Sequence, residues 1–139
     1  MTRPSRAPFD RVQFLPDAVA DVVALNERAP LVAREALRLL KQVDQRTLLP
    51  QPLHAFSKTG DLSDCGKIVV LVEGEKEHRI VVRDVGGAVE VVEVVCVEER
   101  TGDLPYLLAG LRLGRIEEPV RRSDASRRVD RIRRIRSRE

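Results

Sequence analysis

The chain has 139 residues, of which 42% are hydrophobic and 34% charged, and its formal net charge is +3. This length suits one domain, no apolar run reaches the roughly 18 residues of a membrane span, and no secretion signal is recognisable at the N-terminus. An aromatic content of 3% argues against a base-stacking surface. Cys65 and Cys96 have no partner at metal-ligand spacing, so we expect no metal, cofactor or disulfide, and a reducing cytoplasm as the location.

The predicted elements begin after a flexible lead-in of residues 1–9. Residues 11–15 alternate polar and apolar side chains, which favours a short strand. Pro16 and Pro30 each suit the first turn of a helix, and apolar residues recur behind both at helical spacing. We therefore expect a helical hairpin that covers the core. Residues 46–63 are rich in proline and glycine, have little periodicity, and are predicted to form a loop.

Three strands are expected next, over residues 67–72, 78–85 and 88–97. Gly86-Gly87 indicates a tight turn before the last strand, because glycine tolerates positive φ. That strand is apolar on nearly both faces, as expected of a central strand covered on each side. Strict alternation would place Val89, Val91, Glu93, Val95 and Val97 on one face and Glu90, Val92, Val94 and Cys96 on the other.

A short helix is predicted over residues 103–113. The order of elements then predicts an α+β domain over residues 10–118, with a small antiparallel or mixed sheet and the N-terminal helical hairpin packed on one face. Residues 119–139 form a basic extension, a helix or a tail. Its apolar stripe is too narrow for a stable isolated helix, so the segment docks on the body or folds on a partner.

This extension makes the protein basic. Residues 120–139 hold nine arginines against three acidic residues, whereas the other 119 residues hold 16 basic and 19 acidic side chains. Arginine-rich segments favour polyanions through counterion release, and a solvated tail or an acidic protein partner are the alternatives. The candidates for RNA contact in this segment are Arg121, Arg122, Arg127, Arg128, Arg131, Arg133 and Arg134.

Three cations and a phenol fall at the edges of the predicted strands, namely Lys67, Arg79, Arg100 and Tyr106. Cutting RNA without a metal requires an aligned 2′-hydroxyl, stabilisation of the charge that builds up on the phosphate, and proton transfer. Arginine suits the second task because its fork matches phosphate oxygens and stays charged. These residues therefore suit the binding and cutting of a phosphodiester.

Structural interpretations of the same residues stay open. Lysine and arginine are common at solvated strand ends, and a tyrosine flanked by proline and leucine is usually packed. Arg79 could instead pair with Glu90 or Glu93 on the next strand.

The stretch from Asp64 to Tyr106 resembles the RelE-type toxins of bacterial toxin–antitoxin systems. The shared features are Asp64-Cys65-Gly66-Lys67-Ile68 at the opening of a strand, His78-Arg79 in the next strand, a valine-rich strand, Arg100 and Tyr106. Three positions differ from the family pattern: Gly66 and Val82 stand where aromatic residues are usual, and Val69 where a second basic residue is common.

The resemblance implies a ribosome-dependent, metal-independent endonuclease that cleaves mRNA by 2′-hydroxyl attack and is inhibited by a cognate antitoxin. Lys67 and Arg79 would bind and neutralise the scissile phosphate, Arg100 would stabilise the transition state, and Tyr106 would stack on or orient the RNA. Lys58 and His78 are further candidates for RNA contact, and His78 could act as a general base. His54, in the proline-rich loop, receives no role.

Two other functions stay open. One is a toxin similar to the ParE type, which targets DNA gyrase and lacks the nuclease residues. The other is a degenerate relative that only binds its antitoxin or a nucleic acid.

Overall fold

The computed structural model describes residues 9–56, 58–86 and 90–137. In these ranges the chain forms β1 (Val12–Phe14), α1 (Pro16–Arg28), α2 (Pro30–Asp44), β2 (Gln51–Pro52), β3 (Ala55–Phe56), β4 (Gly60–Asp61), β5 (Cys65–Val70), β6 (His78–Gly86), β7 (Val91–Glu99), α3 (Leu104–Arg112) and α4 (Pro119–Ser137). Most of the expected flexible lead-in lies outside the described residues, as do Gly87 of the expected turn and the start of the expected last strand.

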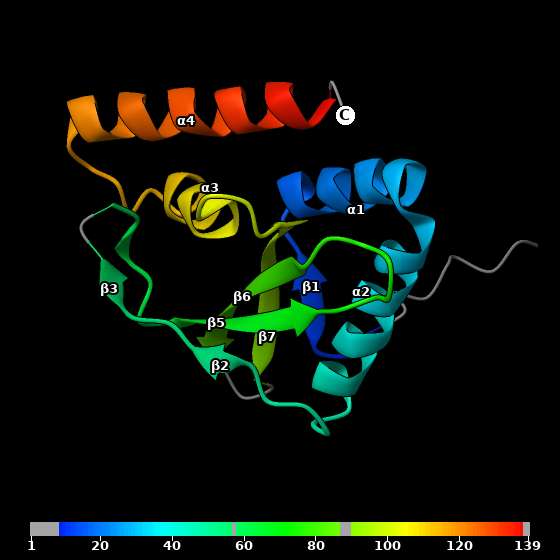
Figure 1. Cartoon of the computed structure of the whole chain (residues 1–139). Coiled ribbons are helices and arrows are strands. Elements are labelled where there is room, and N and C mark those ends of the chain that lie inside the picture. Colours follow the sequence, from blue (N-terminus) through cyan, green and yellow to red (C-terminus); the bar gives the residue numbers. More distant parts are fainter. Residues whose placement is uncertain (1–8, 57, 87–89, 138–139) are drawn as a thin grey trace, which may run out of the picture.

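Five strands form one mixed sheet in the order β1-β7-β6-β5-β2 (Figure 1). β1 runs parallel to β7, and the other neighbours are antiparallel. The predicted α+β class is therefore confirmed. The prediction of a plain loop over 46–63 is wrong, because this segment contains β2 and the small β3–β4 hairpin. Strands of two residues are too short to show alternation, so only their pairing defines them.

Helices cover both faces of the sheet (Figure 1). The predicted hairpin of α1 and α2 packs on one face, over a core that includes Leu25, Leu40 and Ile80. On the other face α3 and α4 cover a second core, which includes Val81 and Leu107. β7 lies between β1 and β6 and contributes to both cores, as expected of a covered central strand.

A bulge in β7 changes which side chains face which core. Val81 of β6 lies opposite Cys96, but Val82 lies opposite Val94, so Val95 is the extra residue of β7. The strict alternation predicted for this strand is therefore wrong beyond Val94. Val97 joins the core under the hairpin, while Val95 and Cys96 pack in the core under α3 and α4.

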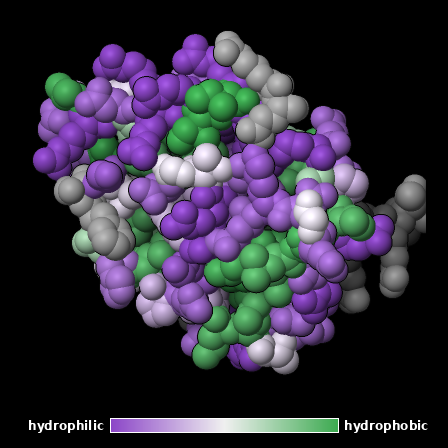
Figure 2. All heavy atoms as spheres, viewed as in Figure 1, coloured by the Kyte–Doolittle hydropathy of each residue, from purple (hydrophilic) through white to green (hydrophobic). Residues whose placement is uncertain are grey.

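The arginine-rich extension is a helix that docks on the body, one of the two outcomes expected for it. α4 lies across α3 and reaches α1 (Figure 1). Ala125 and Val129 are buried against the core beneath α3, and Ile132 packs at its edge. The upper part of the molecule, where α4 lies, is mainly hydrophilic (Figure 2). Among the described helices, none combines the length and hydrophobicity that crossing a bilayer requires.

Candidate functional site

The four residues singled out for phosphodiester chemistry line a single pocket. It has a volume of about 660 Å³ and lies between the segment of β2 to β4, the sheet and the start of α3. Lys67, Arg79, Arg100 and Tyr106 all contribute to its wall, as does Lys58. The rest of the lining comes from Gln51, Pro52, Leu53, His54, Thr59, Leu62 and Asp103.

Strand register explains how distant residues meet here. In the β5–β6 ladder, Lys67 lies opposite Val81, and Arg79 lies opposite Val69. Because side chains alternate along a strand, Lys67 and Arg79 lie on the same face, diagonally across the two strands. Arg100 follows β7 directly, and its backbone N–H donates to the carbonyl of Glu77 at 2.9 Å. The first turn of α3 then brings Tyr106 over the same face.

Arg79 is held in place by two partners. Its Nε donates to Oε2 of Glu77 at 2.8 Å, and its Nη1 donates to the hydroxyl oxygen of Tyr106 at 2.7 Å. Burial alone would lower the pKa of Arg79, but the hydrogen bonds to Glu77 and Tyr106 raise it. The guanidinium is therefore a fixed and permanent cation, with a side chain only 13% exposed.

The alternative in which Arg79 pairs with a glutamate of the next strand is wrong. Glu93 instead accepts a hydrogen bond from Arg83 at 2.6 Å. Glu90 lies 3.8 Å from guanidinium nitrogens of Arg11 and Arg46, at another edge of the sheet.

The pocket carries an excess of positive charge. Within the described part of the chain, the side chains of Lys58, Lys67 and Arg100 form no hydrogen bond or ion pair, whereas Glu77 neutralises Arg79. Asp103 is the one acidic residue among those that line the pocket. Unpaired cations around a concave site attract an anion such as a phosphate.

Two glycines let the wall of the pocket close in on the sheet. A Cβ at Gly66 would lie 2.7 Å from Cβ of Pro50, so the chain entering β2 can approach β5 this closely only because residue 66 has no side chain. An aromatic residue, usual at this position in the RelE pattern, has no room here. At Gly110 of α3, a Cβ would overlap the carbonyl of Thr59, which lies in the turn between β3 and β4. Glycine thus sets the position of the residues that bring Lys58 and Thr59 to the pocket.

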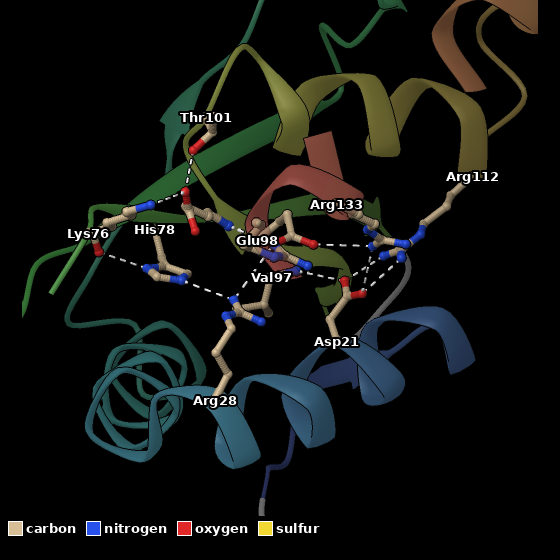
Figure 3. A network of polar contacts seen from close by, with 11 residues as sticks. Asp21, Arg28, Lys76, His78, Val97, Glu98, Thr101, Arg112 and Arg133 are labelled. Atoms are coloured by element: carbon tan, nitrogen blue, oxygen red, sulfur yellow. Dashed lines mark hydrogen bonds and ion pairs between the residues drawn. The ribbon is translucent and has the colours of Figure 1, made fainter. Parts of the chain in front are cut away.

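His78 is not part of this pocket. It is 2% exposed and lies on the face beneath α1 (Figure 3). Its Nδ1 donates to the carbonyl of Lys76 at 2.8 Å, and its Nε2 accepts from Arg28 at 3.3 Å. Burial and the nearby Arg28 charge lower the pKa of His78. The prediction that His78 contacts RNA or acts as a base is corrected, because the side chain next to an outward residue of a strand points inward.

His54 lines the pocket, although sequence reasoning assigns it no role. It lies between β2 and β3, and its imidazole is exposed at the pocket. No motif or periodicity marked it. The only available signal was that the proline-rich segment precedes the strand carrying Lys67, which becomes informative once β2 is known to pair with β5.

The arginines of α4 divide into two sets. Arg133 and Arg136 turn inward onto Glu98, a buried carboxylate of β7, and Arg133 also lies 3.6 Å from Asp21 of α1 (Figure 3). This anchoring role corrects the assignment of Arg133 to an RNA-contacting surface. The remaining candidates lie on the outer surface of α4, where Arg121, Arg122, Arg127, Arg131 and Arg134 are exposed and Arg128 is half-buried.

The docked side of α4 contacts the loop that carries Arg100 and Asp103, two residues of the pocket wall. A Cβ placed at Gly102 in this loop would lie 3.4 Å from Cδ1 of Ile132 and 3.8 Å from Nη2 of Arg128. The loop therefore separates the pocket from α4 by about one layer of side chains.

Comparison with known proteins adds no relative to this description. No model of a known family, no curated protein and no solved structure matches the chain.

Proposed function

We propose that the protein is a RelE-like toxin, a metal-independent endoribonuclease that cleaves mRNA on the ribosome and is held inactive by a cognate antitoxin. The observation that supports this most strongly is the convergence of Lys67, Arg79, Arg100 and Tyr106 on one positively charged pocket. An activity that depends on the ribosome would place the protein in the cytoplasm.

In this proposal the 2′-hydroxyl oxygen of RNA attacks the adjacent phosphorus while the bond to O5′ breaks. The products are a 2′,3′-cyclic phosphate and a free 5′-hydroxyl. Lys67 and Arg79 bind the phosphate oxygens, and the guanidinium of Arg100 stabilises the negative charge that builds up in the transition state. The bond from Arg79 to the hydroxyl of Tyr106 holds the phenol ring at the pocket, where it orients the RNA.

The outer arginines of α4 extend the binding surface. Exposed Arg127, Arg131 and Arg134 follow one side of the helix, and residues four apart on a helix are separated by about 6 Å along its axis. A row of arginines on a helix that contacts the pocket loop suits the backbone of an RNA that enters the pocket.

The test is cleavage of mRNA after induced expression, with mapping of the new 5′ ends. We expect growth arrest and cuts within translated codons, and Arg100→Ala should lower the cleavage rate about 100-fold. Arg34→Ala is the matched control, since Arg34 is an exposed cation on α2, which covers the opposite face of the sheet.

Two results would overturn this proposal. Arrest that survives Arg79→Ala and Arg100→Ala and that comes with signs of DNA damage would favour a ParE-like toxin. An absence of arrest would favour a relative that only binds a partner.

A further inference from the structure

The pocket has cations to bind a phosphate, but cleavage also needs a group that takes a proton. Arginine stays charged and cannot do so, and the hydroxyl oxygen of Tyr106 already accepts a hydrogen bond from Arg79. Among the described residues that line the pocket, His54 and Asp103 carry groups that can accept a proton. The neutral amines of Lys67 and Lys58 could do so as well. Imidazole is the side chain whose ordinary titration lies nearest to neutral pH.

The backbone holds His54 firmly at the pocket. On one side, the N–H of Leu53 donates to the carbonyl of Cys65 at 3.0 Å, directly after the pairing of Pro52 with Gly66. On the other side, Ala55 pairs with Asp61 in the β3–β4 hairpin. Leu53 is itself buried, so the residue before His54 is fixed by packing as well. These two contacts fix the backbone on both sides of His54 and so position the residue at the pocket, and proton transfer requires such positioning.

Asp103 is less suited to the same step. It begins α3 with φ 63°, a conformation uncommon for residues other than glycine, asparagine and aspartate, and it contributes a backbone carbonyl to the first turn of the helix. Ordinary carboxylates are also weaker bases than imidazole.

We propose that His54 is the general base of this pocket, an inference that rests on the proposed RNA cleavage. His54 takes the proton of the 2′-hydroxyl as O2′ bonds to phosphorus. The P–O5′ bond breaks, its electron pair goes to O5′, and O5′ takes a proton from water. The imidazolium then returns its proton to water, so the cycle balances without a metal or a second substrate.

The experiment measures single-turnover cleavage of ribosome-bound mRNA from pH 5 to 9. In the unchanged protein, the rate should rise with pH on the acid side until the base is deprotonated. His54→Ala should lower the rate at neutral pH at least 100-fold, remove this acid-side rise, and leave binding of a 2′-O-methyl RNA within twofold. Added imidazole should restore part of the lost rate in His54→Ala, since a small molecule can occupy the truncated site.

The variants separate the two proposals. Suppose that Arg100→Ala loses cleavage while His54→Ala keeps both the cleavage rate and its rise with pH. The role of His54 is then overturned, and the proposed nuclease function stands. If Asp103→Asn abolishes the rise instead, the base is Asp103. If the unchanged protein does not cleave RNA at all, both proposals are wrong. Far-ultraviolet circular dichroism and urea unfolding of His54→Ala confirm that the variant is folded.

Discussion

The ionic contact that holds α4 on the body can be tested by changing one carboxylate, that of Glu98. Glu98 is 3% exposed and receives hydrogen bonds from Arg133, Arg136 and its own neighbour, the N–H of Glu99. Arg28 of α1 lies 3.8 Å from the same carboxylate. We expect Glu98→Gln to release α4 from the body, because a neutral amide cannot balance these guanidinium groups and α4 has only a thin apolar contact of its own.

The size of the effect follows from burial. Removing one partner of a fully buried ion pair costs about 3–5 kcal/mol. Here the side chains of Arg133 and Arg136 are 36% and 17% exposed, so water compensates part of the loss. We therefore expect Glu98→Gln to lower the free energy of unfolding by about 2 kcal/mol, with the larger change in the local opening of α4.

Two assays follow this change, urea unfolding at neutral pH and amide hydrogen exchange over residues 125–132. Glu93→Gln is the control, since Glu93 lies on the same strand but pairs with Arg83, away from α4. Protection of α4 that is equal in Glu98→Gln and in the unchanged protein would refute the anchor.

Lowering the pH should weaken the same contact, because it protonates the carboxylate of Glu98. Burial alone would raise the pKa of Glu98, but the Glu99 N–H, Arg136 and Arg133 lower it below the ordinary glutamate value. Its contribution to stability is therefore present above about pH 4.3, the ordinary glutamate value, and is lost as pH falls through the lowered one.

The remaining predictions concern His78 and the outer arginines of α4. Because burial lowers the pKa of His78, the unfolded chain binds a proton that the folded chain resists, so stability falls as pH drops below about 6.5. His78→Gln should flatten urea-unfolding stability between pH 7 and 5, and an equal slope in both proteins would contradict this. The double variant Arg127→Ala with Arg131→Ala should bind 2′-O-methyl RNA with a weaker dependence on salt. The slope of the logarithm of the binding constant against the logarithm of the salt concentration should fall by about 1.4, measured by fluorescence anisotropy between about 50 and 200 mM salt. An unchanged slope would exclude Arg127 and Arg131 from the RNA surface.

The helices and long strands could be predicted because their signals are local. Pro16 and Pro30 begin α1 and α2 where they were expected, since proline has the φ of a helix and no N–H to satisfy in the first turn. β5 to β7 follow from runs of β-branched residues. β2 to β4 could not be predicted, because each is only two residues long and carries no pattern of its own; β2 is defined by its pairing with β5, and β3 and β4 by their pairing with each other.

The candidate site could be predicted only in part, for a related reason. Lys67, Arg79, Arg100 and Tyr106 have a recognisable order, and antiparallel pairing brings them to one face. His54 belongs to no recognisable motif. It reaches the pocket because β2, which was not predicted, pairs with β5. The inward turn of Arg133 depends on Glu98, whose face is set by the bulge at Val95, and a single extra residue in a strand leaves no sequence signal in a run of valines.

The bulge at Val95 places Glu98 on the face of the sheet that carries both the pocket and α4. Arg79 and Glu98 lie directly opposite each other on β6 and β7 and share a face of the sheet. Arg79 nevertheless bonds to Glu77 and Tyr106, while Glu98 bonds to the inward arginines of α4. Glu98 is the carboxylate directly opposite Arg79 in the ladder, and its charge is balanced by Arg133 and Arg136 of α4. It therefore does not neutralise Arg79. The positive charge of the pocket therefore depends on where α4 docks, although no inward arginine of α4 lines the pocket.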